Sequence, residues 1–218
     1  MRFQHLFICV SLILFVLIAG FANAEILYNG DFEFGLSGWS TWGSGSGSGP
    51  SGSIWKPFYG TIADSGGSDG GKYLELETPM AGYYEDWGWA WCDAWQSFPT
   101  HGDNRLLDGD FFSVNAFVKN IWGTETLIDG AEISFEWLDE TGGIISRDSG
   151  FFDVTGDWSS VTHTAFAPEG AVGFNLVISN PLPEQGIGFD MIGHLIPEPI
   201  SLILFALGGL MLRIKRGK

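Results

Sequence analysis

The sequence predicts an all-β protein whose strands pack as a jelly-roll β-sandwich. Three observations favour this fold class: short runs rich in β-branched and aromatic residues, turn residues between the runs, and no sustained helical period. In one run Ile133, Phe135 and Trp137 alternate with polar residues, as in a strand with one buried face. The expected strands lie at 73–77, 87–98, 111–119, 132–138, 144–152, 160–167, 172–178 and 187–192. A jelly roll is a common arrangement for eight antiparallel strands.

Residues 43–52 consist only of glycine, serine and one proline. Such low-complexity sequence offers few side chains that can pack. We therefore interpret 43–52 as a long surface loop inside a domain that spans residues 25–193.

The composition excludes several classes of protein. The chain has 26 acidic and 10 basic residues, a formal net charge of −16, and a strongly acidic body repels nucleic acid. A hydrophobic content of 45% and an aromatic content of 15% are too high for intrinsic disorder. The two cysteines are too few for a small domain held together by disulfides.

Residues 1–24 have the three parts of a secretory signal peptide. Arg2 precedes an apolar stretch at 6–21, and Ala22-Asn23-Ala24 forms a small-residue cleavage site. We expect cleavage after Ala24; the alternative is an uncleaved membrane anchor of the same length.

The C-terminal segment 194–218 contains a Pro-Glu-Pro triplet, a short apolar stretch and a basic tail. As a helix, the apolar residues 200–212 would be about 20 Å long, which is shorter than the ~30 Å hydrocarbon core of a bilayer. The basic tail is expected to stay in the cytoplasm. These features predict a weak, temporary anchor in the inner membrane. The residues of the triplet and tail are Pro197, Glu198, Pro199, Arg213, Lys215 and Arg216.

This arrangement resembles the PEP-CTERM sorting signal of bacteria. The resemblance implies processing by an exosortase and export to the cell envelope, the surface or the extracellular matrix. The alternative is an ordinary C-terminal anchor with a chance Pro-Glu-Pro.

Short motifs also follow one another along the body. They are Asn29-Gly30-Asp31-Phe32-Glu33 with Gly38-Trp39, 71–76, 94–98, 108–119, Asp157-Trp158, 167–171 and Gly188-Phe189-Asp190. In this order they resemble carbohydrate-binding modules of families four and nine and their galactose-binding-like relatives. The resemblance implies a jelly-roll domain and a polysaccharide partner, while the stretch 43–52 and the run around Trp87 depart from the family pattern.

A row of tryptophans marks the candidate ligand-binding residues. Trp87, Trp89, Trp91 and Trp95 share one face of an extended strand, where flat rings suit stacking on sugar rings. Nearby polar side chains that could bond sugar hydroxyls are Tyr83, Tyr84, Glu85, Asp86, Asp93 and Gln96. The alternative is that this face is the inner wall of the sandwich, because tryptophan is highly buried on average. Our interpretation favours the core for at least two of the first three.

Other aromatic and acidic residues are assigned structural roles. We expect Trp39, Trp137 and Trp158 in the core, and we interpret Glu132 and Glu136 as a solvated strand face.

The family resemblance further implies a structural calcium ion held by Glu33 and Asp190, since Ca²⁺ prefers oxygen ligands. The alternative is that both are ordinary carboxylates. The sequence contains no G-x-S-x-G motif of a catalytic serine. Cys92 has no neighbouring histidine and is expected to be a buried thiol.

These inferences predict a non-catalytic, exported surface or matrix protein that binds glycans. Its expected partners are an exosortase and a polysaccharide, such as an exopolysaccharide matrix. The alternative function is a structural component of the envelope or biofilm that binds no sugar.

Overall fold

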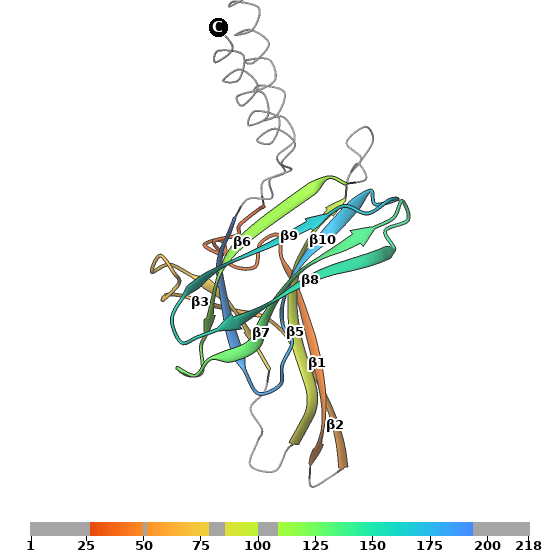
Figure 1. Ribbon diagram of the computed structural model, residues 1–218. Coiled ribbons are helices and arrows are strands. Elements are labelled where there is room, and N and C mark those ends of the chain that lie inside the picture. Colours follow the sequence, from red (N-terminus) through yellow and green to blue (C-terminus); the bar gives the residue numbers. More distant parts are fainter. Residues whose placement is uncertain (1–26, 50–51, 79–85, 100–108, 194–218) are drawn as a thin grey trace, which may run out of the picture.

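Two antiparallel β-sheets face each other in the computed structural model, which describes residues 27–49, 52–78, 86–99 and 109–193 (Figure 1). The six-stranded sheet has the order β2-β1-β5-β10-β7-β8. Its strands are β1 Ser40–Gly49, β2 Gly52–Phe58, β5 Asp86–Pro99, β7 Leu127–Leu138, β8 Ile144–Val154 and β10 Gly173–Asn180. The five-stranded sheet has the order β3-β4-β11-β6-β9. Its strands are β3 Thr61–Ala63, β4 Tyr73–Glu77, β6 Phe111–Asn120, β9 Ser159–Phe166 and β11 Gly186–Gly193. The predicted all-β jelly-roll sandwich is confirmed.

The signal peptide and the C-terminal sorting signal expected from the sequence lie outside the described residues. Within the described ranges, no helix is long and apolar enough to cross a membrane.

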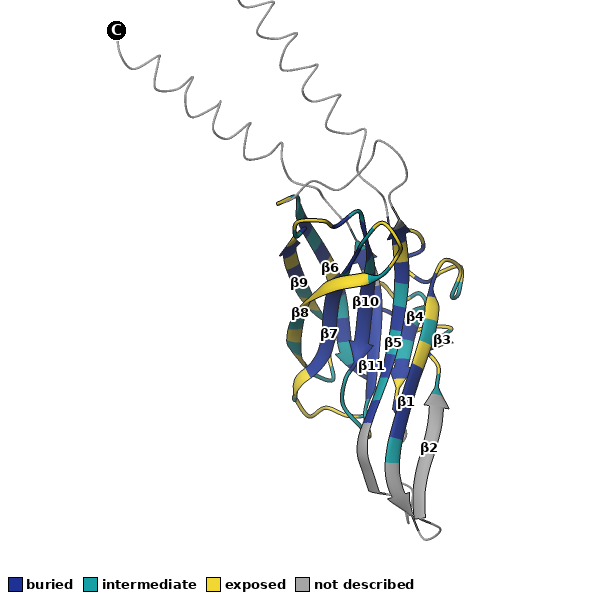
Figure 2. Cartoon of the chain, turned by 90° about the vertical axis from the view of Figure 1, so that its right-hand side faces the viewer, coloured by how far each residue is buried: buried dark blue, intermediate teal, exposed yellow. Residues whose placement is uncertain are grey.

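The core lies between the two sheets and is rich in aromatic rings. Phe112 of β6 packs against Phe135, Trp137 and Phe174 of the opposite sheet, with ring centroids 5.1–6.1 Å apart. Alternation along β7 turns Ile133, Phe135 and Trp137 into this core, as the sequence pattern predicts. Figure 2 shows β7 and β10 buried along most of their length.

The N-terminal motif closes one part of the sandwich. The buried Asn29 side chain donates to the carbonyls of Gly35 (2.7 Å) and Ser37 (3.1 Å) and accepts from the Phe34 amide (3.0 Å). Trp39 Nε1 donates to the Asn29 carbonyl at 3.1 Å, and its ring is buried as expected. These contacts hold the turns that lead into β1.

The interpretation of residues 43–52 as a surface loop is wrong. Residues 43–49 belong to β1, which pairs with β2 on one side and β5 on the other. A Cβ on Gly43 would overlap the carbonyl oxygen of Trp91, so glycine permits the close approach of β1 to β5. Backbone pairing, rather than side-chain packing, places this stretch in the sheet.

The prediction that Trp158 lies in the core is also corrected. Trp158 is half-buried and packs edge-to-face against Tyr73, with ring centroids 5.2 Å apart. It stands just before β9, in the alternation that faces away from the buried His163 and Ala165. Its Nε1 donates to the Gly66 carbonyl at 3.0 Å, which ties the loop before β4 to the outside of the five-stranded sheet.

Candidate functional site

The face of the six-stranded sheet that points away from the core, here called the outer face, carries the candidate site. Along β5, Ala90, Cys92 and Ala94 are buried on the core side. Trp91 and Trp95 alternate with them and are half-buried on the outer face. Trp91 is therefore outside the core, and the preference for two core residues among Trp87, Trp89 and Trp91 depends on the other two. Trp87 and Trp89 lie in β5, but their side chains are outside the described part.

Strand register surrounds Asp93 with aromatic and polar neighbours on the outer face. Asp93 lies between Trp91 and Trp95 along β5, opposite Trp42 of β1 and Ser179 of β10. Trp42 remains 38% exposed, and its ring meets that of Tyr59 edge-to-face at 5.6 Å. The sugar-facing surface suggested for β5 thus extends to β1.

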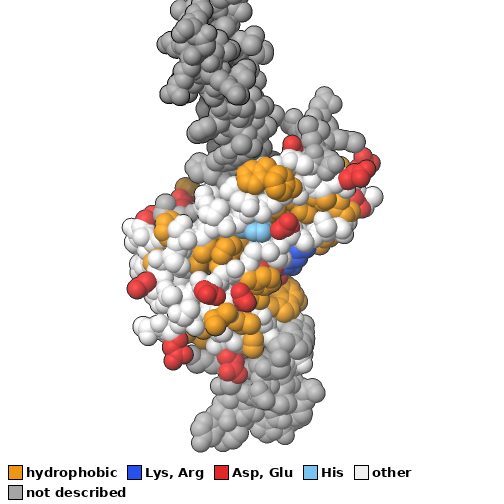
Figure 3. All heavy atoms as spheres, viewed as in Figure 1, with side chains coloured by type: hydrophobic (Ala, Val, Ile, Leu, Met, Phe, Trp, Pro, Cys, Tyr) orange, Lys and Arg blue, Asp and Glu red, His pale blue; other side chains and the backbone are white. Residues whose placement is uncertain are grey.

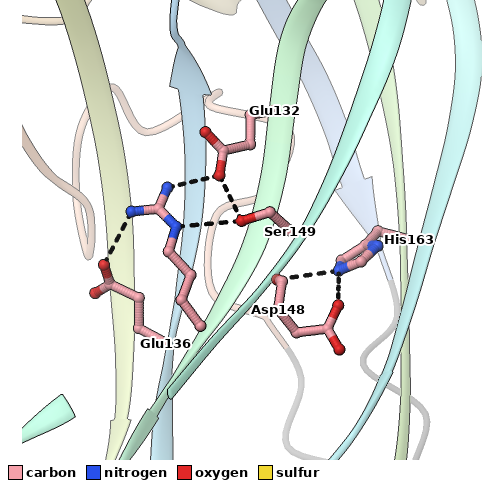
Figure 4. A network of polar contacts seen from close by, with 6 residues as sticks. Glu132, Glu136, Asp148, Ser149 and His163 are labelled. Carbon is pink, nitrogen blue, oxygen red and sulfur yellow. Dashed lines mark hydrogen bonds and ion pairs between the residues drawn. The ribbon is translucent and has the colours of Figure 1, made fainter. Parts of the chain in front are cut away.

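An arginine of β8 joins two carboxylates of β7 on the same outer face (Figure 4). Arg147 of β8 donates through Nη2 to Glu132 Oε1 at 2.8 Å and through Nη1 to Glu136 Oε1 at 3.2 Å. Ser149 Oγ donates to the same Glu132 oxygen at 2.7 Å. The turn between β7 and β8 sets this register: Asp139 accepts from the Gly143 amide at 2.9 Å. The prediction that Glu132 and Glu136 form a solvated strand face is therefore wrong, because Glu132 is buried.

Hydrogen bonds continue from Glu136 back to β5. Asn175 Nδ2 of β10 donates to Glu136 Oε2 at 3.2 Å, and Ser97 Oγ of β5 donates to Asn175 Oδ1 at 2.8 Å. Together with Arg147, these residues form a chain of polar contacts across β5, β10, β7 and β8. The outer-face site comprises Trp42, Trp91, Asp93, Trp95, Ser97, Glu132, Ser134, Glu136, Arg147, Ser149, Asn175 and Ser179.

Two hydroxyls in the centre of the site are buried without partners. Ser134 of β7 and Ser179 of β10 are 0% and 2% exposed. Among the described residues, neither Ser134 Oγ nor Ser179 Oγ has a hydrogen-bond partner. Because an unsatisfied buried hydroxyl costs free energy, such atoms are normally paired. Both hydroxyls lie on the outer side of the sheet, beneath the side chains that cover it.

The Asp93 carboxyl has an altered pKa. Burial raises the pKa of Asp93 to about 6, and the nearby carboxylates of Glu132 and Glu136 act in the same direction. Arg147 opposes the rise, as does Ser179, whose hydroxyl lies near the carboxyl without a hydrogen bond of normal geometry.

Gln96 lies on the opposite face of β5 from Trp91 and Trp95. It is buried, and its amide bonds to the backbone: Oε1 accepts from the Tyr28 amide, and Nε2 donates to the carbonyls of Tyr28 and Gly38. The contacts of Gln96 are therefore structural, and it is not brought together with the outer-face tryptophans.

Two further titratable side chains lie beside the site without joining it. Cys92 is a buried thiol, as predicted, and burial raises its pKa to about 12. His163 of β9 lies on the core side of β8, stacked on Phe135 and 3.3 Å from Asp148 Oδ1 (Figure 4). Neither group faces the outer surface of the sheet.

Glu33 and Asp190 meet the same loop between β3 and β4. Asp190 Oδ2 accepts from the amide and hydroxyl of Ser68 at 2.6 and 2.8 Å, while Glu33 Oε1 accepts from the Lys72 amide at 2.7 Å. A Cβ on Gly67 would lie 2.8 Å from Asp190 Oδ2 and 2.9 Å from the Lys72 carbonyl oxygen, so oxygens converge on this glycine. Within the described ranges, no three His, Cys, Asp or Glu side chains cluster as metal ligands. A cation here would need backbone carbonyls as well.

Sequence reasoning missed most of the polar half of the outer-face site. Glu132 and Glu136 alternate with core residues, and alternation identifies a face without showing whether that face is buried. Arg147, Asn175 and Ser179 become neighbours only through strand pairing. The available signal was Arg147 itself, a lone basic residue within an expected strand of an acidic body.

The sequence matches no protein-family model and no curated protein. Among solved structures, the xylan-binding domain CBM22-1 of Paenibacillus barcinonensis Xyn10C has a TM-score of 0.50 and 14% identity over 79% of this chain and 96% of that chain. The C-terminal family 22 carbohydrate-binding module of Clostridium thermocellum Xyn10B has a TM-score of 0.50 and 11% identity over 82% and 98%. At such identities the likeness concerns the fold: the chain has the β-sandwich fold of carbohydrate-binding modules.

A third similar structure is the enzymatically active domain of tailspike protein 4 of bacteriophage CBA120. Its TM-score is 0.54, with 18% identity over 78% of this chain. The present chain spans only 21% of that tailspike chain.

Proposed function

We propose that the protein binds a polysaccharide through the outer-face site and does not cleave it. The observation that carries this proposal is one face that combines half-buried indole rings with a chain of polar contacts. The apolar face of a pyranose ring stacks on an aromatic ring, while its hydroxyls need donors and acceptors at the edge. The fold shared with xylan-binding modules adds support.

The site is wide enough for several sugar units. One register row runs across five strands from Trp42 through Asp93, Ser179 and Glu132 to Phe151. Neighbouring strands lie about 4.8 Å apart, so this row is roughly 19 Å long. An extended row with aromatic residues at both ends suits an internal segment of a chain rather than a single sugar.

The contacts of Glu132 and Glu136 support binding without hydrolysis. A glycosidase needs one carboxylic acid and one carboxylate on either side of the scissile bond. Glu132 and Glu136 are both engaged by Arg147, and they lie on one strand of the sheet. In this proposal they orient the guanidinium and accept sugar hydroxyls.

The location of the protein is a second part of the proposal. The signal peptide and the PEP-CTERM-like tail support export, exosortase processing and a final place on the cell surface or in the extracellular matrix. A structural envelope component with the same ends and no sugar ligand is the competing function. Labelled exopolysaccharide would separate the two, because only the binding protein retains it.

A structural calcium ion is the third part. Asp190, Glu33 and the carbonyl oxygens around Gly67 form an oxygen-rich loop of the kind that Ca²⁺ prefers. The ion would join the N-terminal segment, this loop and β11, and so stabilise the sandwich away from the outer face.

Affinity electrophoresis of the full chain against a panel of soluble polysaccharides tests the binding proposal. For any polysaccharide that retards the protein, Trp91→Ala and Trp95→Ala should abolish most of the retardation. Phe166→Ala is the matched control, because Phe166 is an exposed aromatic residue of the other sheet, and it should bind normally. Each outer-face tryptophan variant should lose about 1–2 kcal/mol of stability, against about 3–5 kcal/mol for Trp137→Ala in the core. Equal retardation of all the variants would reject the site.

A further inference from the structure

The outer-face site contains an excess of negative charge. Its described residues include three carboxylates, Asp93, Glu132 and Glu136, and one cation, Arg147. The Arg147 guanidinium is divided between Glu132 and Glu136, at 2.8 and 3.2 Å. No basic side chain of the described residues forms an ion pair with Asp93. Acidic side chains are scattered over the view of the molecule in Figure 3, in which basic ones are scarce.

The surroundings of Asp93 suit a cation. Trp91 and Trp95 flank it along β5, and Trp42 lies opposite on β1, so indole rings surround a partly buried carboxylate. A cation is attracted both by a carboxylate and by the face of an indole ring, more strongly where water is partly excluded. The buried Ser179 hydroxyl lies beside Asp93 and favours its ionised form.

Building on the proposed function, we infer that the polysaccharide bound here carries free amino groups, one of which is held as an ammonium against Asp93 and the neighbouring indole rings. The ammonium supplies the positive charge that the site lacks. Uronic and sulfated sugars are disfavoured, because their negative charges would approach three carboxylates that share a single arginine.

The raised pKa of Asp93 is consistent with this role. Burial makes the ionised carboxylate unfavourable in the free protein, which raises its pKa to about 6. At neutral pH the free site therefore holds an ionised carboxyl that forms no ion pair with the described residues and is stabilised by the charge of the more distant Arg147. A bound ammonium compensates this charge and gains a charge-assisted hydrogen bond.

The test is calorimetric titration of the full chain with two hexasaccharides of the same β-1,4 backbone, one of glucosamine and one of N-acetylglucosamine. We expect the glucosamine hexamer to bind about tenfold more tightly at pH 6.5. The preference should fall to within about twofold at pH 9, where sugar amines are neutral. Xylohexaose and oligogalacturonate complete the series as neutral and anionic ligands.

The matched variants separate a specific site from general attraction between an acidic protein and a polycation. Asp93→Asn and Glu169→Gln each remove one negative charge. Glu169 is exposed in the turn before β10, at the far end of that strand from Ser179 and roughly 20 Å from Asp93. Asp93→Asn should lose the preference and Glu169→Gln should keep it.

The outcomes distinguish the two proposals. Equal binding of the glucosamine, N-acetylglucosamine and xylose oligomers overturns the amino-sugar inference and leaves polysaccharide binding intact. A preference that both variants reduce equally also overturns it, because overall charge would then be the cause. Failure of all four ligands to bind overturns the inference together with the proposed function.

Discussion

The side-chain amide of Gln96 pairs with the backbone of Tyr28 in both directions: Oε1 accepts from the Tyr28 amide at 3.0 Å, and Nε2 donates to the Tyr28 carbonyl at 2.9 Å. The same Nε2 reaches the Gly38 carbonyl at 3.3 Å. A single side chain of β5 thus replaces a neighbouring strand for the segment that precedes β1. Gln96 holds the N-terminal motif on the sandwich while its neighbours Trp95 and Ser97 face outward.

Gln96→Ala should therefore affect stability and leave ligand binding unchanged. Removing the amide leaves backbone groups of Tyr28 and Gly38 without their part-buried partner and empties the buried position of Gln96, which should cost about 1–3 kcal/mol. Urea unfolding measures this loss, and Ser97→Ala, at the next, exposed position, should change stability by less than about 1 kcal/mol. Unchanged stability combined with lost sugar binding would contradict the structural role.

Gly43→Ala tests the place of the glycine-serine stretch in the sheet. The new methyl group would overlap the Trp91 carbonyl oxygen and lie 2.7 Å from Cys92 Cα, so β1 would have to move away from β5. We expect a loss of about 2 kcal/mol or more in urea unfolding.

Ser44→Ala, at the next position, adds no atom and serves as the control for Gly43→Ala. It should cost less than about 1 kcal/mol. If Gly43→Ala is as stable as the parent protein, residues 43–49 do not pair with β5 as described.

The sequence predicted the strands with apolar side chains and missed those that depend on backbone pairing. The expected strand at 73–77 coincides with β4, and the expected strand at 111–119 is one residue shorter than β6. β1 and β2 were not predicted, because glycine and serine show no apolar alternation. β2 pairs with β1, and β1 pairs in turn with β5, about forty to fifty-five residues further along the chain, so a local pattern cannot identify this pairing.

The candidate site also has a part that the sequence predicted and a part that it did not. The row of tryptophans was visible as a pattern, but the pattern could not distinguish the inner from the outer face of β5. Trp91 faces outward because Cys92 and Ala94, with their small side chains, fill the core beneath the aromatic cluster. Asp93 could be named from its place in the row, whereas the ion pairs of Arg147 depend on the β7–β8 register.

Calcium should raise the melting temperature of the full chain. An ion that binds only the folded state at about 100 times its dissociation constant adds about 2.7 kcal/mol. For a domain of this size that corresponds to a shift of roughly 5–10 °C between calcium and chelator.

Glu33→Gln and Asp190→Asn should each remove the calcium-dependent shift in melting temperature, whatever they do to stability without calcium. Asp157→Asn, at an exposed position before β9, should keep the shift. A melting temperature that does not respond to calcium would remove the ion from the proposal.

Asp93 should make the protein less stable as the pH rises from about 4 to about 6. The pKa of Asp93 is about 6 in the folded chain, against about 3.9 for an unfolded aspartate. Between these values the folded state binds more protons than the unfolded state, so the free energy of unfolding falls with increasing pH. Each pKa unit corresponds to about 1.4 kcal/mol, and allowing for partial solvation we expect a loss of about 1–2 kcal/mol at pH 7.

Asp93→Asn removes this loss while keeping the size and most hydrogen-bonding capacity of the side chain. The variant should match the parent protein near pH 4 and exceed its stability by about 1–2 kcal/mol at pH 7 in urea melts. Subtracting the free energies of unfolding of the two proteins removes the contributions of titrating groups that do not interact with Asp93. The pH dependence that remains between about pH 4 and 6 is then assigned to Asp93. A constant difference across that window would show that the carboxyl is not desolvated. A gain in stability at pH 7 accompanied by lost amino-sugar preference would mean that the charge of Asp93 is retained for the ligand at the expense of the fold.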